Sequence, residues 1–325
     1  MTKIERLGAV FRNDTPDCTP AGFWLHYPSD WDPKKTAQAH LKLYRETGMD
    51  IIKIMDDSAG NYFTNGVNIA KSADWRGVAF PGTDSAHYRR MSELIKLVAD
   101  AASGEVMLFP TVWSPFKMAS FTYAASRGAT GQPRSDADLM NDCASDPDSV
   151  AVGLDAIASV LEEFVAGYVE SGGNGIYYSA QFSEPGRFTD ERWEKLVKPY
   201  DIRVLNAAKK AGGLIITHIC GEPEYEFRTS PARYAGYPGD LFNWAVHRND
   251  LDLNGGRELF GTPVMGGMHN RGVLINGDEA SIRAEVRRVI QHAGKKGFML
   301  GADCTVPSDI SYDRLRIAVD EAHRM

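Results

Sequence analysis

The sequence predicts a single-domain α/β fold, a closed (β/α)8 TIM barrel that covers residues 1–325. Two observations predict it: short apolar runs alternate with amphipathic stretches of helical period, and this strand–helix unit recurs eight times along the chain. Alternation of strands and helices implies parallel strand pairing. The length agrees with this fold, because α/β barrels exceed the usual size of one domain while remaining a single unit.

The expected strands are short, mostly apolar runs bounded by glycine or polar residues. In chain order they cover residues 23–27, 51–55, 106–111, 175–179, 214–218, 241–246, 263–267 and 298–301. The expected helices cover residues 33–47, 86–102, 148–170, 190–211, 231–234, 254–259, 278–292 and 312–323. The helix at 278–292 has the clearest period, with Ile282, Val286 and Val289 on one stripe and charged residues opposite.

Connection lengths predict which end of the barrel carries the active site. The loops from helix to strand are short, whereas two loops from strand to helix are long, at residues 56–85 and 112–147. In a (β/α)8 barrel the strand-to-helix loops line the C-terminal face of the sheet, where active sites form. Long loops at that face commonly act as lids or binding walls. We therefore expect functional residues at the C-terminal ends of the strands.

Composition and charge exclude several classes of protein. With 43% hydrophobic and 24% charged residues, the chain has the composition of a globular protein with a large core. A net charge of −7 does not provide the basic face that broad nucleic-acid binding requires. No apolar run reaches the length of a membrane span, and residues 1–6 lack the apolar stretch of a signal peptide. We expect a cytoplasmic protein that binds neither nucleic acid nor membranes.

Three metal-binding side chains follow expected strands. His218 and Cys220 are two residues apart at the end of an apolar run, and alternate residues of an extended chain point to the same side. Cys304 closes another apolar run far along the chain. One nitrogen and two sulfurs form an incomplete zinc site, and catalytic zinc commonly has three protein ligands and one open position. From the spacing alone, a shared metal and unrelated core positions are equally favoured.

Other polar residues have two interpretations each. Glu184 and His269 follow the fourth and seventh expected strands, so both are candidate site residues at the C-terminal face. A solvated turn is the alternative for Glu184, and a helix N-cap is the alternative for Asp57. Trp24 and His26 share one side of the first expected strand, and we expect both to face the core. Of the four cysteines, the two in polar stretches, at positions 18 and 143, are expected to be incidental.

Three motifs resemble the uroporphyrinogen decarboxylase superfamily. They are His-Ile-Cys-Gly at 218–221, Val-Met-Gly-Gly-Met-His-Asn-Arg-Gly-Val-Leu at 264–274, and Gly-Ala-Asp-Cys-Thr-Val-Pro at 301–307. The similarity extends from the first expected strand to the C-terminal helix. The resemblance implies the (β/α)8 barrel that the alternation of elements also predicts.

Within that superfamily, the sequence resembles the corrinoid-dependent methyltransferase branch. The branch has a His-x-Cys pair and a distant cysteine as zinc ligands, which the resemblance assigns to His218, Cys220 and Cys304. True uroporphyrinogen decarboxylases instead carry an arginine-rich motif near the N-terminus. Here only Arg6 and Arg12 precede the first expected strand, and they are well apart.

The resemblance implies a zinc-dependent methyltransferase that moves a methyl group between a corrinoid protein, or a related donor, and a thiol or tetrahydrofolate. Zinc would hold an acceptor thiol as its reactive thiolate. Without substrate, water or Glu184 is expected at the fourth zinc position, and His269 is expected to assist turnover. Two alternatives remain: a decarboxylase-like lyase acting on a small carboxylated substrate, and a non-catalytic partner of a corrinoid protein.

Overall fold

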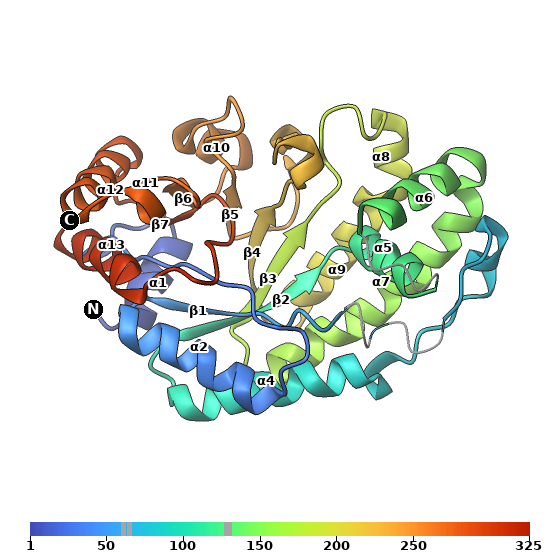
Figure 1. Ribbon diagram of the computed structural model, residues 1–325, viewed down its shortest axis with the longest axis horizontal. Coiled ribbons are helices and arrows are strands. Elements are labelled where there is room, and N and C mark those ends of the chain that lie inside the picture. Colours follow the sequence, from blue (N-terminus) through green and yellow to red (C-terminus); the bar gives the residue numbers. More distant parts are fainter. Residues whose placement is uncertain (60–62, 64–66, 127–131) are drawn as a thin grey trace.

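One parallel sheet of seven strands forms the centre of the structure, a computed structural model that describes residues 1–59, 63, 67–126 and 132–325, without the side chains of 132–135. The strands are hydrogen-bonded in chain order, and every neighbouring pair is parallel. They are β1 (Ile51–Ile54), β2 (Met107–Trp113), β3 (Gly175–Ala180), β4 (Leu214–Ile219), β5 (Leu241–Trp244), β6 (Val264–Met268) and β7 (Phe298–Ala302). Their C-terminal ends therefore meet at one end of the curled sheet (Figure 1).

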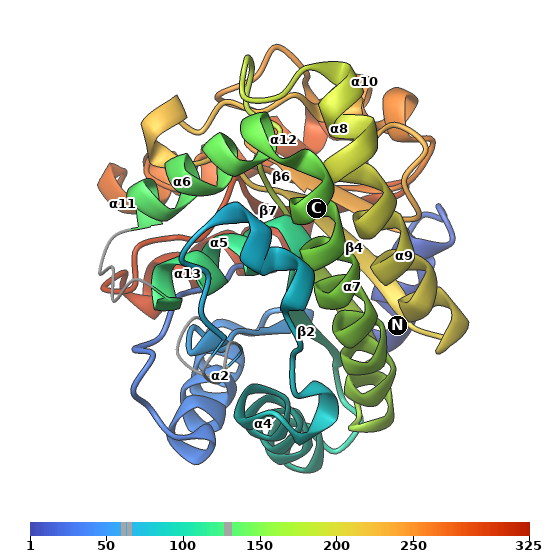
Figure 2. The same ribbon diagram turned by 90° about the vertical axis from the view of Figure 1, so that its right-hand side faces the viewer.

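Helices cover the outer face of the sheet (Figures 1 and 2). They include α2 (Pro33–Thr47), α4 (Ala86–Ala102), α7 (Pro147–Glu170), α8 (Asp190–Leu196), α9 (Lys198–Lys210), α10 (Leu253–Phe260), α12 (Glu279–Ala293) and α13 (Tyr312–Arg324). Several begin where a side chain accepts a first-turn N–H, as Asp32 does before α2 and Asp278 before α12. α2 packs against α4 and also against α13, so the first and the last helix of this layer are neighbours. None of the helices in the described ranges is long and apolar enough to cross a membrane.

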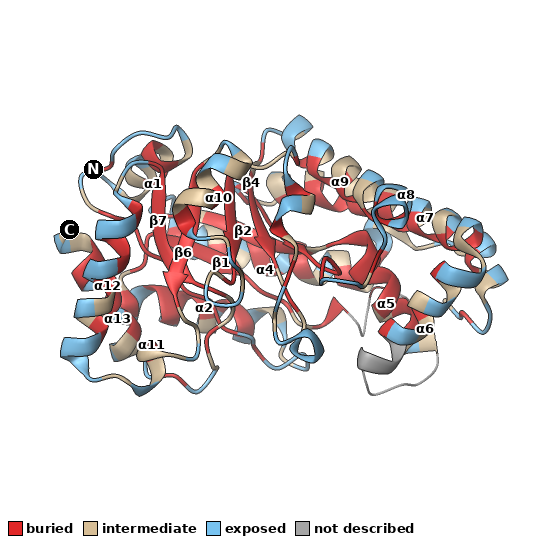
Figure 3. Ribbon diagram, turned by 90° about the horizontal axis from the view of Figure 1, so that it is seen from above, coloured by how far each residue is buried: buried red, intermediate tan, exposed pale blue. Residues whose placement is uncertain are grey.

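The interior of the sheet is filled by one apolar residue from each strand, together with three residues from the N-terminal region. The interior cluster consists of Leu7, Val10, Trp24, Ile51, Phe109, Tyr177, Ile216, Leu241, Met265 and Met299. Leu7 and Val10 belong to α1 (Lys3–Phe11), a helix that the sequence analysis did not predict. Because Ile51 and Leu241 are the first residues of their strands, α1 packs at the N-terminal end of the sheet. Figure 3 shows the buried strands inside helices whose outer sides are exposed.

The first strand of the expected barrel is not a regular strand. The chain makes one isolated bridge, from Ala21 to Leu300 of β7, and residues 23–27 are irregular. On its other side, Ala21 accepts the backbone N–H of Asp50, but its own N–H is bound by the Asp50 carboxylate. A side chain thus replaces part of the backbone ladder. The described residues therefore form seven strands and one isolated bridge, and not the eight strands of the expected closed barrel.

The two long connections contain more structure than expected. The second, predicted as a loop, contains α5 (Pro115–Ser126) and α6 (Gln132–Ser145). α5 buries most of its residues, so no polar stripe reveals its period in the sequence. Residues 60–62 and 64–66 of the first connection and 127–131 of the second lie outside the described residues. The remaining short helices are η1 (Ser72–Gly77), η2 (Gly82–Asp84), η3 (Pro223–Tyr225), η4 (Pro231–Tyr234) and α11 (Val273–Asn276).

The helix expected at 190–211 is interrupted and forms α8 and α9. The interruption lies at Val197, directly before a segment that contains Pro199. Proline lacks a backbone N–H, and its ring collides with the carbonyl four residues earlier in a continuous helix. Proline is tolerated in the first turn of a helix, and Pro199 occupies that place in α9.

Candidate metal centre

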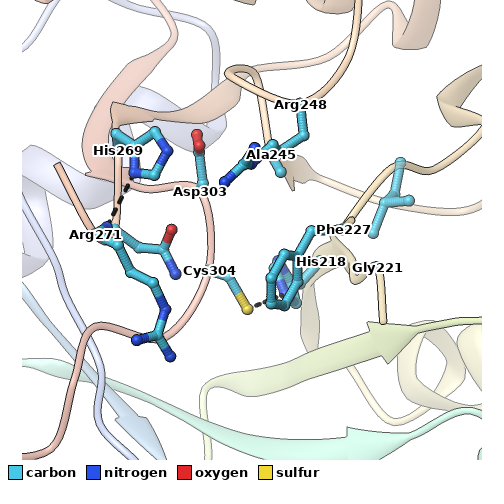
Figure 4. Close-up of a pocket in the computed structure, with 11 residues that line it drawn as sticks. His218, Gly221, Phe227, Ala245, Arg248, His269, Arg271, Asp303 and Cys304 are labelled. Carbon is cyan, nitrogen blue, oxygen red and sulfur yellow. Dashed lines mark hydrogen bonds between the residues drawn. The ribbon is translucent and has the colours of Figure 1, made fainter. Parts of the chain in front are cut away.

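Three side chains with nitrogen or sulfur ligands meet at the C-terminal end of the sheet. His218 lies in β4, Cys220 follows β4 directly, and Cys304 follows β7. Cys304 Sγ lies 3.9 Å from Cys220 Sγ and 3.5 Å from His218 Nε2. The ligand atoms all lie within 4.8 Å of one another, and Figure 4 shows Cys304 pointing toward His218. We call these three side chains the metal centre.

The spacing of the three atoms fits a tetrahedral zinc ion. Zinc–sulfur bonds of about 2.3 Å and zinc–nitrogen bonds of about 2.0–2.1 Å at tetrahedral angles separate two sulfurs by about 3.8 Å and sulfur from nitrogen by about 3.6 Å. Two of the three distances, 3.9 and 3.5 Å, agree closely with these values, and Cys220 Sγ lies within 4.8 Å of the His218 ring nitrogen. Thiolate and imidazole are also ligands that zinc prefers. The residues present therefore fit a zinc ion in chemistry and in approximate spacing.

Asn243 of β5 determines how His218 presents its ring. The Asn243 Nδ2 amide donates to the carbonyls of Met265 and Ala302, at 2.9 and 3.1 Å. Its Oδ1 therefore faces His218 and accepts from His218 Nδ1 at 2.5 Å. Because an amide oxygen only accepts, the proton resides on Nδ1 and the lone pair of Nε2 faces the sulfurs. The sequence analysis missed Asn243, although an amide between Phe242 and Trp244 of a buried strand was a signal.

The two cysteines of the metal centre contact each other through their sulfurs. The hydrogen bond between them raises the pKa of Cys220 well above its ordinary value and lowers the pKa of Cys304 well below it. Burial opposes a thiolate at Cys304, and His218 favours it. A metal that binds both sulfurs as thiolates releases their protons, so metal affinity should rise with pH.

A buried amine of β1 shares its aromatic neighbours with the metal centre. Lys53 is 7% exposed, and its Nζ lies 4.5 Å from the ring centroid of Tyr177 and 5.3 Å from that of Trp24. The same two rings contact the His218 ring, with centroid distances of 5.6 and 5.8 Å. Burial lowers the pKa of Lys53 to about 8, against the opposing effect of Asp57 and the two cysteines. A lysine inside an apolar strand was a sequence signal, and the sequence analysis did not use it.

His269 lines a narrow pocket beside the metal centre, together with Arg248 and Arg271 (Figure 4). The His269 Nδ1 accepts the backbone N–H of Arg271 at 3.0 Å. In the neutral ring the proton therefore resides on Nε2. Its ring lies 5.0 Å from that of His247, which is held by Asp303 at 2.9 Å. Burial lowers the pKa of His269, so its neutral form is favoured near pH 7. The structure therefore places His269 close to the metal centre but outside the set of ligands.

Glu184 is buried in an ion-pair network and does not join the metal centre. Its carboxylate binds Arg187 Nη1 at 3.0 Å and accepts the backbone N–H of Glu222 at 3.2 Å. Arg187 also binds Asp136 at 2.9 Å, and Glu222 binds Lys117 of α5 at 2.8 Å. These bonds satisfy Glu184 and connect the segment after Cys220 to the helix α5. Glu184 is not among the residues whose ligand atoms lie together at the metal centre.

His26 lies at the mouth of the sheet and not in the core. Its side chain is 47% exposed, and its ring binds Asp57 at 2.8 Å and Thr305 Oγ1 at 3.1 Å. The expectation of a core position was wrong because the chain leaves the sheet after its single bridge. Asp57 binds this ring and also accepts the backbone N–H of Tyr27 at 3.0 Å. Cys18 and Cys143 are free cysteines outside the metal centre.

Comparisons with known proteins agree with this fold. A family model described as "Uroporphyrinogen decarboxylase (URO-D)" matches residues 55–325. The structure of a methyltransferase from Methanosarcina mazei has a TM-score of 0.80 and 14% sequence identity, over 100% of this chain and 99% of that chain. A B12-independent methionine synthase from Shewanella sp. W3-18-1 has a TM-score of 0.57 and 12% identity, over 95% and 94% of the two chains. No curated protein gives a significant match.

Proposed function

This chain belongs to the uroporphyrinogen decarboxylase family, and we propose that it is a zinc-dependent methyltransferase. The proposed reaction moves a methyl group between a corrinoid protein, or a related donor, and a thiol or tetrahydrofolate acceptor. One observation carries the proposal: two sulfurs and an imidazole nitrogen converge within 4.8 Å of one another, with two of their distances at the spacing of zinc ligands, at the end of the sheet where barrel enzymes have their active sites. The likeness to a methyltransferase structure supports the same class of reaction.

The proposed roles follow from the contacts of each residue. His218, Cys220 and Cys304 hold the ion, and Asn243 keeps the lone pair of His218 Nε2 directed toward it. Zinc with three protein ligands supplies an open position and stabilises a bound thiol as its thiolate. The neighbouring pocket borders His218 and Cys304 of the metal centre, and His269 offers an imidazole there whose neutral form is favoured.

Metal analysis and turnover together test the proposal. Protein purified without added zinc is expected to contain about one zinc per chain. Removing the zinc with a chelator should abolish methyl transfer from a methylated corrinoid to a thiol or tetrahydrofolate, and zinc should restore it. Stoichiometric zinc without turnover would favour a non-catalytic partner of a corrinoid protein. Decarboxylation of a small carboxylate by zinc-free protein would favour the lyase and contradict the proposal.

The arginines nearest the N-terminus give no support to the decarboxylase-like alternative. Arg6 is bound to Asp17 at 2.8 Å and to Asp50 at 2.7 Å, and Arg12 is bound to Asp14 at 3.1 Å. Both arginines belong to the region of α1, at the opposite end of the sheet from the metal centre. They therefore stabilise the N-terminal region and do not meet a substrate carboxylate at the C-terminal face.

Replacing His269 with alanine is expected to slow methyl transfer by roughly a hundredfold, the low end of acid–base contributions. The zinc content should stay unchanged, because His269 is not a metal ligand. Steady-state rates and metal analysis on the same preparations check both statements. His292→Ala is a matched control, since His292 is an exposed histidine of α12 that binds Asp252. Normal kinetics in His269→Ala would show that His269 has no part in the reaction.

A further inference from the structure

Lys53 is a buried cation to which the proposed function gives no role. Among the described residues, its Nζ has no carboxylate partner at ion-pair distance, and Met55 Sδ lies 3.9 Å away. Its other neighbours are the faces of Tyr177 and Trp24. A buried ammonium group without an anionic partner costs free energy. Its presence in the interior therefore calls for a compensating negative charge nearby.

The acidic groups that favour the charged form of Lys53 are, largest first, Asp57, Cys304 and Cys220. Asp57 is engaged with His26 at the mouth of the sheet. The two cysteines belong to the metal centre, and Lys53 shares its aromatic neighbours with His218. In an apolar interior that water does not screen, a unit charge acts over several ångströms. A positive charge on Lys53 therefore favours a metal centre whose ion and ligands together carry a negative net charge.

Charge counting shows which ligand Lys53 favours. A divalent zinc ion, two thiolates and a neutral imidazole have no net charge, and a thiolate as fourth ligand adds one negative charge. We propose that Lys53 is a positioning residue that makes the metal centre selective for an anionic fourth ligand. This inference rests on the proposed function and deepens it. In the metal-loaded protein the acceptor thiol would give its proton to the buffer and its sulfur would bind the metal in place of the ligand at the fourth position, so that nothing is oxidised or reduced.

The experiment compares an anionic and a neutral ligand of the same metal. Cobalt replaces zinc in the full chain because it accepts the same ligands and reports them in its absorption spectrum. The probes are 2-mercaptoethanol, which binds as a thiolate but has no other charge, and imidazole, which binds neutral. In Lys53→Met, the affinity for 2-mercaptoethanol is expected to fall by about tenfold or more, because the variant loses the attraction between the Lys53 ammonium and the bound thiolate in the protein interior. The affinity for imidazole and the cobalt content should stay unchanged.

Three outcomes decide the proposal. An equal loss of affinity for both ligands would assign Lys53 a packing role only, and an unchanged thiolate affinity would remove its electrostatic role; either result overturns the proposal. Lys53→Arg keeps the charge and should retain the preference for thiolate. If Lys53→Met does not fold, Lys53→Gln removes the charge with a polar side chain and serves the same comparison. A wild-type protein that binds no cobalt or zinc would instead overturn the proposed function itself.

Discussion

The Cys220→Ser and Cys304→Ser variants are expected to contain almost no zinc, against about one ion per chain in the wild type. Each substitution exchanges a soft thiolate for a hydroxyl group that does not ionise near neutral pH, and leaves one sulfur and one imidazole as ligands. Metal analysis after dialysis against a weak chelator measures the loss. Methyl transfer should disappear with the metal, because no other described residues form a comparable group of ligands.

The fold of both serine variants is expected to survive. Cys220 and Cys304 follow the ends of β4 and β7, and neither belongs to the interior cluster that fills the sheet. The unfolding transition of the variants should therefore match that of metal-free wild type. Cys18→Ser is the matched control, since it makes the same chemical change far from the metal centre. A Cys220→Ser or Cys304→Ser protein with full zinc and full activity would contradict the ligand assignment.

The residues of the metal centre could be predicted because each belongs to a local pattern. Strand alternation places His218 and Cys220 on one side, and an apolar run places Cys304 at the same end of the sheet. Asn243 could not be found in this way, because its partners come from β3, β4, β6 and β7. The position of Glu184 depends on a buried network with α5 and α6, and the helical character of both was hidden in the sequence.

The fold was predictable wherever backbone pairing alone decides the structure. Strands β1 to β7 lie within a few residues of the expected runs, because short apolar segments bounded by glycine or polar residues favour buried parallel strands. The prediction failed for residues 23–27, which follow the single bridge at Ala21, where the Asp50 side chain takes a hydrogen bond that a neighbouring strand would supply. It also failed for α1, whose apolar side is short and packs against the open end of the sheet.

The Asn243→Leu variant is expected to bind zinc about 10–100-fold more weakly than the wild type, the usual effect of removing a partner behind a metal ligand. Leucine has a similar size but accepts no hydrogen bond, so His218 Nδ1 and the carbonyls of Met265 and Ala302 all lose their partner. Each buried group left unpaired costs about 1–3 kcal/mol, so the free energy of unfolding should fall as well. Competition with a chromogenic chelator measures the affinity, and denaturant unfolding of metal-free protein measures the stability.

Two further variants separate the effect on His218 from the effect on stability. Asn243→Asp keeps an acceptor for His218 Nδ1 but places a carboxylate against two carbonyl oxygens, so we expect zinc affinity to recover while stability stays low. Asn254→Ala removes an amide bond to the carbonyl of His292 on the outer layer, and should lower stability alone. If Asn243→Leu binds zinc as tightly as the wild type, the His218 ring does not depend on Asn243. If all three variants weaken zinc in proportion to their loss of stability, Asn243 contributes to the fold and not to the metal centre.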